Sequence, residues 1–312
     1  MKSEKVITKP VDSRVSIKKT KWRTSHVYGW LFASPWVIGM LLFFAFPLLS
    51  SIYFSFTSYS IINPGEFVGL QNYRDLMNDS LFWTAIYNTV YFTVFFVPLS
   101  IFCGVSLALF LNMKVKGMAI YRTIFFLPTL VPHVAMAVLW VWLLNPQFGL
   151  VNGMLAAVGM DGPAWLGSET WSKPSLILMS LWGIGQAVVI YLAGLHDISQ
   201  DYYDAAEVDG ANSVQKIGHI TLPLLTPVIF FNLVMGVIGA FQQFTLPYTM
   251  TKGQGTPGNS LVFYVMHIYD NGFKFFKMGY ASAMAWILFV VIMALTTLIF
   301  VTSKRWVHYQ GN

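Results

Sequence analysis

Long apolar runs alternate with short polar segments along most of this chain. Each run is close to the ~20 residues that a helix needs to cross a bilayer. Six such runs predict an all-α, polytopic membrane protein with six transmembrane helices. The predicted spans are residues 28–56, 84–112, 119–143, 174–195, 224–249 and 279–302.

One polar segment, residues 199–227, lies between the fourth and fifth predicted spans. Ser199 is a good N-cap, and the acidic residues after it suit the positive end of a helix's first turn. This pattern predicts a short helix over residues 200–208. Gly210 then permits the left-handed backbone geometry that ends a helix.

The rest of this segment predicts a second short helix. Asn212 or Ser213 can cap it, and it runs through Ile220. Pro223 and Pro227 predict a bend where the chain enters the fifth span. A capped helix-turn-helix is more elaborate than a tether between two spans requires.

The composition supports a membrane protein and excludes several other classes. Of 312 residues, 56% are hydrophobic and 10% charged, which is too apolar for a soluble protein of this size. The single cysteine, Cys103, provides neither a disulfide framework nor a metal cluster. No paired carboxylates and no nucleophile with its base are in reach of one another. We predict no catalytic residue, no metal site and no cofactor bound by this chain.

The net charge of +6 is unevenly distributed, because eight of the 19 Lys and Arg residues fall within residues 1–23. Residues 1–27 are predicted to form a basic cytoplasmic tail, and residues 28–312 the transmembrane domain. With the N-terminus inside, 14 Lys and Arg face the cytoplasm and 5 face outward. This asymmetry predicts that both termini and the polar segment are cytoplasmic.

Three motifs in the polar segment resemble the EAA loop of permease subunits of binding-protein-dependent ABC importers. They are Asp204-Ala205-Ala206, Asp209-Gly210-Ala211 and Ile220-Thr221-Leu222-Pro223. The resemblance implies a type I permease fold in which residues 197–223 dock on a cytoplasmic ATPase. Asp204 replaces the usual Glu, so this acidic contact is one methylene shorter. The coupling residues implied are Asp204, Ala205, Ala206, Glu207, Asp209, Gly210 and Ala211.

Nucleic acid is not expected as a partner of this helix-turn-helix. Residues 197–223 carry five carboxylates, and Lys216 is their one fixed positive charge. A DNA-reading element needs the opposite balance.

Two further segments are similar to the carbohydrate-uptake, maltose-type branch of the same permeases: residues 67–73 (FVGLQNY) and Asn145-Pro146. The resemblance implies import of a sugar or oligosaccharide that an extracytoplasmic binding protein delivers. It also implies a second, homologous permease and two ATPase subunits, which hold ATP and Mg²⁺, in the bacterial inner membrane.

The span interiors contain no Asp, Glu, Lys or Arg. This argues against ion-coupled transport, in which charged residues within the membrane usually mark the ion pathway. Neutral amides and an aromatic residue suit a sugar, whose hydroxyls bind amides and whose CH faces pack on rings. Interhelical hydrogen bonding accounts for the amides equally well. The residues in question are Trp182, Gln186, Asn232, Gln242 and Gln243.

The resemblance to the maltose permease sharpens this choice, because Gln243 falls where that family has a sugar-contacting Asn. Several neighbouring positions are smaller here, which implies a wider or differently shaped cavity. The complete predicted substrate path is Trp182, Gly183, Gln186, Ala187, Gly236, Gly239, Ala240, Gln242 and Gln243.

Alternative functions remain open at this point. A permease of the same fold could carry a glycerol phosphodiester or phosphate ester, which a basic residue in the path would favour. A secondary transporter would need no ATPase, but the EAA-like loop argues against it. His133, in the third span, is interpreted as a packing residue with a hydrogen bond rather than a proton relay, since no span holds a carboxylate to partner it.

Overall fold

The computed structural model describes residues 22–308. The chain divides into two compact units, one ending at Ser50 and one beginning at Ser51. The described part of the first unit is one apolar helical run, composed of α1 (Trp22–Met40), the π-helical η1 (Leu41–Ala45) and the start of α2 (Phe46–Ser55). α1 begins earlier than the predicted residue 28. The rest of the predicted basic tail, residues 1–21, lies outside the described residues.

The predicted all-α architecture with up to six membrane spans is confirmed. Within residues 22–308, four helical runs are long and apolar enough to cross a membrane: residues 28–55, 80–111, 213–250 and 278–303. Two bent helix pairs account for the third and fourth predicted spans. The short helices outside these runs are α3 (Gln71–Asn78), α7 (Leu150–Ala157), η3 (Trp165–Gly167), α10 (Gln200–Val208), α14 (Tyr264–Tyr269) and η5 (Asp270–Lys274). α13 (Thr245–Met250) is the end of the run over residues 213–250.

The third span is broken rather than straight. α5 (Met118–Phe126) and η2 (Leu127–Leu130) are followed, after a turn of 100°, by α6 (His133–Leu143). The break lies at Val131, whose ψ of 124° is extended. The ring of the following proline disfavours the helical conformation of the residue before it, so the sequence itself contains the reason for the break.

The fourth span also bends, by 50° between α8 (Glu169–Trp182) and α9 (Gly185–His196). Gly183 lies at this break and ends α8. Glycine is a poor residue for a helix interior, so the helix is weakest at this point.

The helix does not end at Pro223 or Pro227, where the sequence predicts a bend. α11 (Ser213–Lys216), η4 (Ile217–Thr221) and α12 (Leu222–Phe241) form one continuous helical run. Pro223 occupies the first turn of α12, and the π-helical η4 widens the helix directly before it. This wider turn accommodates the missing proline N–H and its ring without ending the helix.

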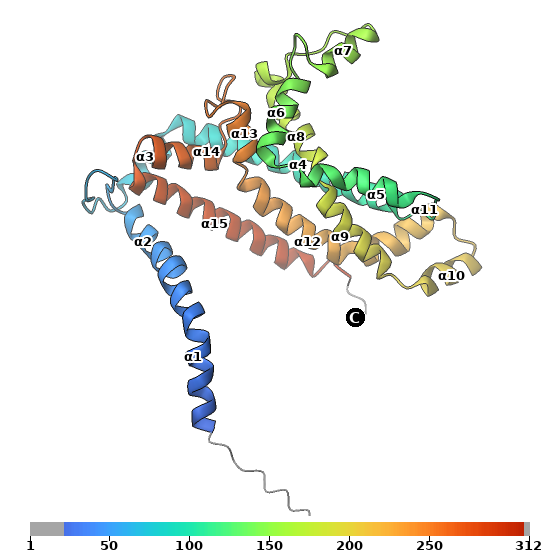
Figure 1. Ribbon diagram of the computed structural model, residues 1–312, viewed down its shortest axis with the longest axis horizontal. Helices are drawn as coiled ribbons and strands as arrows, with labels where there is room; N and C mark the ends of the chain where they lie inside the picture. Colours follow the sequence, from blue (N-terminus) through green and yellow to red (C-terminus); the bar gives the residue numbers. More distant parts are fainter. Residues whose placement is uncertain (1–21, 309–312) are drawn as a thin grey trace, which may run out of the picture. The chain divides into compact units, whose positions relative to one another are not determined.

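In the second unit, α4 (Ser80–Leu111) packs against α8, α9 and α12, and α12 packs against α15 (Met278–Ser303). The bundle has two clearly different ends (Figure 1). α10 (Gln200–Val208) and α11 lie at one end, here called the α10 end. α13 and α14 lie at the other, here called the α14 end.

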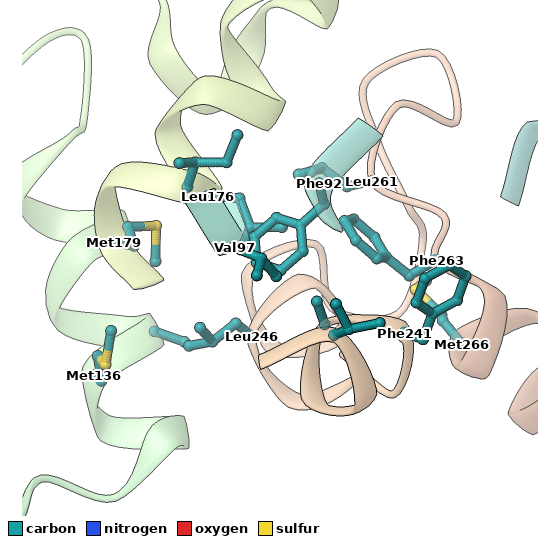
Figure 2. Packing of buried hydrophobic residues seen from close by; sticks show 14 of the residues in the cluster. Phe92, Val97, Met136, Leu176, Met179, Phe241, Leu246, Leu261, Phe263 and Met266 are labelled. Atoms are coloured by element: carbon teal, nitrogen blue, oxygen red, sulfur yellow. The ribbon is translucent and has the colours of Figure 1, made fainter. Parts of the chain in front are cut away.

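Three buried clusters lie within the described bundle, and the smallest, Leu76, Phe82, Tyr264, Ala283 and Met284, joins α3, α4, α14 and α15. The α14-side cluster brings together large side chains of α4, α8, α12 and α14 (Figure 2). Its members include Phe92, Met136, Leu176, Met179, Phe241, Leu246, Leu261, Phe263 and Met266. The α10-side cluster consists of Val105, Ala108, Leu111, Val188, Tyr191, Leu192, Leu195, Ile198 and Leu225.

A polar network holds the α14 end together. Asp79 caps α4, since its Oδ1 accepts a hydrogen bond from the Leu81 N–H at 2.8 Å. Its Oδ2 accepts one from the Tyr280 hydroxyl at 2.9 Å and lies 3.1 Å from His267 Nε2. Burial alone would raise the pKa of the Asp79 carboxyl, but these contacts outweigh burial and lower that pKa.

Candidate functional site

A cavity of about 420 Å³ borders both the α14-side cluster and the α10-side cluster. Its walls come from α4, α6, α9 and α12, with residues from the break between α8 and α9. Phe92, Met136 and Leu246 of the α14-side cluster line it, and so does Tyr191 of the α10-side cluster. The cavity is therefore bordered by helices that are long and apolar enough to cross a membrane, or that belong to the bent pairs.

Most of the predicted substrate-path residues line this cavity. They belong to α9 and α12 or directly adjoin these helices. Along each helix they are spaced three or four residues apart, so they lie on one face of it. Those on the lining are Gly183, Gln186, Ala187, Gly236, Gly239, Ala240 and Gln243.

Trp182 and Gln242 are not among the lining residues. The Trp182 ring packs edge-to-face against Trp140, with centroids 6.1 Å apart. Gln242 is exposed and lies where α12 ends. Gln242 and Gln243 are adjacent, and on a helical backbone adjacent side chains point about 100° apart. Hence only one of the two faces the cavity.

The lining amides are not engaged in interhelical hydrogen bonds. Asn232 Nδ2 donates to the Val228 carbonyl of its own helix at 2.9 Å. Within residues 22–308, the side chains of Gln186 and Gln243 have no hydrogen-bond partner. These two amides are thus free to bind a ligand.

Several lining residues were not included in the predicted path. They add rings, hydroxyls and an imidazole to the cavity wall: Phe92, Phe96, Ser100, His133, Ser180, Tyr191, Phe231 and Asn232. The break at Val131 places His133, the first residue of α6, on the wall. A proline directly before a lone histidine in an apolar run was the signal available in the sequence.

The described cavity wall holds no Asp, Glu, Lys or Arg. Its polar groups are amides, hydroxyls and one imidazole, and its apolar groups include four aromatic rings. Such a surface can exchange hydrogen bonds with neutral hydroxyls and pack against CH groups. It offers no fixed charge to a phosphate or to a coupling ion.

The second candidate site is the 197–223 loop at the α10 end. α10 spans Gln200–Val208, as predicted, and the Ser199 hydroxyl caps it by accepting the Asp201 N–H at 3.3 Å. Gly210 has a φ of +79°, the left-handed conformation that glycine adopts without strain. The predicted turn is confirmed.

The second helix of the loop has a complete capping box. Asn212 Oδ1 accepts the Gln215 N–H at 2.9 Å, and Gln215 Oε1 accepts the Asn212 N–H at 2.8 Å. Lys216 Nζ joins the two helices through Glu207 Oε2 at 2.9 Å. The loop therefore has a defined geometry of its own.

The loop is also anchored to the bundle. The Tyr203 and Thr221 hydroxyls lie 3.0 Å apart and share a hydrogen bond. Tyr203 and Ile220 pack against the α10-side cluster. The loop is therefore in direct contact with the cluster that borders the cavity.

The predicted coupling residues are mostly at the surface of the loop. Asp204, Ala205, Glu207, Asp209 and Gly210 are exposed, whereas Ala206 and Ala211 are half-buried. Val208 is 90% exposed, which is unusual for an apolar side chain in a capped, ordered loop. The surface combines carboxylates with an apolar side chain, a composition suited to contact with another protein.

Comparison with known proteins gives a consistent result. The chain matches the family described as "Binding-protein-dependent transport system inner membrane component" over residues 97–308. It is 40% identical to the probable ABC transporter permease protein YesP of Bacillus subtilis (strain 168), over 95% of this chain and 96% of that protein.

Two further relatives are named for the transport of particular sugars. The chain is 33% identical to the lactose transport system permease protein LacF of Rhizobium radiobacter, over 94% of this chain and 98% of that protein. It is 33% identical to the sulfoquinovosyl glycerol transport system permease protein SmoG of Agrobacterium fabrum (strain C58 / ATCC 33970), over 92% of this chain and 94% of that protein.

Among solved structures, the chain is similar to one in a bacterial alginate ABC transporter in complex with an alginate pentasaccharide-bound periplasmic protein. The TM-score is 0.75 and the identity 25%, covering 91% of this chain and 95% of that chain. A second structure is of a bacterial ABC transporter involved in the import of the acidic polysaccharide alginate. The TM-score is 0.74 and the identity 26%, covering 91% of this chain and 96% of that chain.

Proposed function

The chain belongs to the family of binding-protein-dependent transport system inner membrane components. We propose that it is a permease subunit, through which an ATP-driven importer moves a sugar or oligosaccharide. The observation that carries the proposal is the cavity of about 420 Å³ between α4, α6, α9 and α12, with amides and aromatic rings on its wall.

The chemistry of the cavity supports a carbohydrate. The unpartnered amides of Gln186 and Gln243 can bind hydroxyls, while Phe96 and Phe231 can pack on the CH faces of a sugar ring. The relative named for lactose supports the same class of substrate.

The rival functions receive less support. A phosphate ester calls for a cationic group, and the described wall of this cavity has none. Ion-coupled transport usually places charged residues on the path, and the same wall has no carboxylate. Energy therefore comes from a partner.

The 197–223 loop is our candidate for the contact with that partner. Exposed Asp204, Glu207 and Asp209 next to Val208 offer an acidic and apolar surface to an ATPase subunit. Tyr203 and Ile220 join this surface to the α10-side cluster. ATP-driven movement of the loop would then tilt the spans and open the cavity alternately to the two sides of the membrane.

This assignment also gives an orientation. If the α10 end contacts a cytoplasmic ATPase, the α14 end of the second unit faces the extracytoplasmic binding protein. With six predicted spans and the loop after the fourth of them, both termini are then cytoplasmic. The assembly we propose contains a second, homologous permease and two ATPase subunits. ATP and Mg²⁺ belong to those subunits, because this sequence has no Gly-x-x-x-x-Gly-Lys-Ser/Thr phosphate loop.

The test is ATPase activity and sugar uptake by the complex purified together with its partners and reconstituted in lipid. The binding protein is loaded in turn with lactose, arabinooligosaccharides and starch-derived oligosaccharides. We expect one loaded binding protein to stimulate ATP hydrolysis and uptake together. If no ATPase co-purifies in mild detergent, the importer assignment fails; if ATPase is present but no sugar stimulates it, the substrate class fails.

A further inference from the structure

A separate cavity of about 310 Å³, here called the α5–α9 pocket, lies between α5 and α9. It shares no lining residue with the cavity described above. The two helices approach closely at Gly185, where a Cβ would lie 2.6 Å from the Phe125 carbonyl oxygen. The pocket also reaches His196, the last residue of α9. Because the 197–223 loop follows directly, this part of the pocket lies at the α10 end (Figure 1).

Most of the pocket wall is apolar. Leu111, Val188 and Leu192 of the α10-side cluster form its inner part. Phe125 and Val189 also line it and are 40% and 49% exposed, so the wall continues into an exposed apolar surface. The helices α4 and α9 both end here. The ends of apolar spans lie near the level of the lipid headgroups, and a wall of this kind suits an acyl chain.

The polar part of the pocket is basic. Among the lining residues of the described chain, Arg122 and His196 are the ionisable ones, and none is a carboxylate. Arg122 Nε and Nη2 both donate to the Leu111 carbonyl, at 3.1 and 2.9 Å. Leu111 is the last residue of α4, and the final carbonyls of a helix have no partner within it. This contact holds the guanidinium in a fixed position.

The positive charge of Arg122 is not neutralised within residues 22–308, where it forms no ion pair. Its side chain is half-buried, and a partly buried cation is costly without an anion. A guanidinium has five N–H donors, and the Leu111 carbonyl accepts from two of them. Lys114 and Lys116, in the turn between α4 and α5, add positive charge at the same end.

We propose that the α5–α9 pocket binds an anionic phospholipid, whose phosphate contacts Arg122 and His196 and whose acyl chain lies along Phe125 and Val189. A planar guanidinium matches phosphate oxygens, and basic pockets between transmembrane helices suit such headgroups. The apolar wall favours a lipid over a free anion. The inference does not depend on which substrate the chain transports. A lipid bound here lies beside the candidate coupling surface, since His196 directly precedes the 197–223 loop.

The principal test is native mass spectrometry of the complex, purified with its partner subunits in mild detergent. The complex is titrated with phosphatidylglycerol and, separately, with phosphatidylcholine of the same chain length. We expect the wild type to retain phosphatidylglycerol preferentially. In Arg122→Gln, binding of one phosphatidylglycerol should weaken about 10-fold or more, the effect of losing a charge-assisted hydrogen bond. Equal retention of the two lipids by the wild type would overturn the assignment of an anionic ligand.

Arg305→Gln is the charge-matched control. Arg305 is exposed, follows α15 and does not line the pocket. This variant should bind phosphatidylglycerol as the wild type does. An equal loss in both variants would mean that the lipid responds to net charge and not to the pocket, which contradicts the inference.

Ala193→Phe separates lipid binding from the contact between Arg122 and Leu111. Ala193 lines the pocket and is exposed, so a phenylalanine there should occupy the acyl-chain space while the guanidinium keeps its place. We expect a similar loss of phosphatidylglycerol with an unchanged unfolding temperature. Normal retention in this variant would overturn the proposed site. Equal competition by inorganic phosphate would also contradict it, because the acyl chain would then contribute nothing.

Discussion

The 197–223 loop and the cavity are built in opposite ways. In the loop, each structural feature depends on residues that are close in sequence: Ser199 caps the helix that starts at Gln200, Gly210 makes the turn, and Asn212 pairs with Gln215. In the cavity, each wall comes from a different helix, and residues as distant as Phe92 and Gln243 face the same space.

This difference teaches where each part of the function can be altered. The loop has its own geometry and presents an exposed surface, so substitutions there should affect coupling while the bundle stays folded. The cavity wall is part of the packed bundle, so substitutions there should change substrate affinity in graded steps.

The largest effect is expected from Asp204→Lys combined with Gly210→Pro. Proline fixes φ near −65°, whereas Gly210 has a φ of +79°, so the turn must change shape. The charge reversal removes one carboxylate of the exposed surface. Sugar uptake should fall to background, while the protein still inserts into the membrane.

Gly117→Ala provides the control for backbone strain. Gly117 has a φ of +83° at another turn, before α5, and should tolerate alanine with uptake retained. Normal transport by the Asp204→Lys/Gly210→Pro variant would show that the loop is not a coupling element.

A graded effect is expected from Gln243→Leu, which removes an unpartnered amide from the cavity wall. The apparent KM for the sugar should rise about 3- to 10-fold, since one neutral hydrogen bond contributes about 0.5–1.5 kcal/mol. Measurement of uptake against substrate concentration gives KM and the maximal rate separately. Assembly of the complex should be unaffected.

Gln242→Leu is the matched control, because Gln242 is the adjacent residue and does not line the cavity. Its KM should equal that of the wild type. If both variants behave alike, the side chain at residue 243 is a packing residue, and the path runs elsewhere.

An effect on stability rather than transport is expected from Asp79→Asn at the α14 end. The variant weakens charge-assisted contacts with Tyr280 and His267, and we expect thermal unfolding to show a loss of about 2 kcal/mol. Because folding lowers the Asp79 pKa below its ordinary value of 3.8, the stabilisation is complete above that value. It is lost as the pH falls through the folded-state pKa.

The variant should therefore lose the acid-dependent part of stability that the wild type shows below about pH 4. Asp75→Asn serves as control, since Asp75 is exposed and bonded only to Gln71 among the described residues. It should change stability by less than about 0.5 kcal/mol. Equal losses in both variants would contradict the role given to Asp79.

The smallest effect is expected from Lys216→Gln, which breaks the ion pair with Glu207 inside the loop. The Glu207 side chain is 76% exposed, and exposed ion pairs contribute about 0–1 kcal/mol. Thermal unfolding should hardly change. A loss above about 2 kcal/mol would mean that the pair, and not the helix caps, holds the loop together.

The sequence by itself determined the features that depend on neighbours in the chain. Six apolar runs became helices, and residues 200–208 became α10, because capping, helix propensity and hydrophobic length act over a few residues. Pro132 also accounts for the break before His133, because a proline disfavours the helical conformation of the residue before it. The hydrophobic pattern alone predicts one continuous span there.

Only the tertiary structure decided which side chains meet. It put Gln243 on the cavity wall and Gln242 off it, moved Trp182 out of the path, and left the Tyr191 hydroxyl buried without a partner in the described chain. It also kept the fifth span helical through Pro223 by way of a π-helical turn. The physical reason is that helix rotation and the contacts between α4, α6, α9 and α12 are fixed by packing between residues far apart in sequence, which no local pattern specifies.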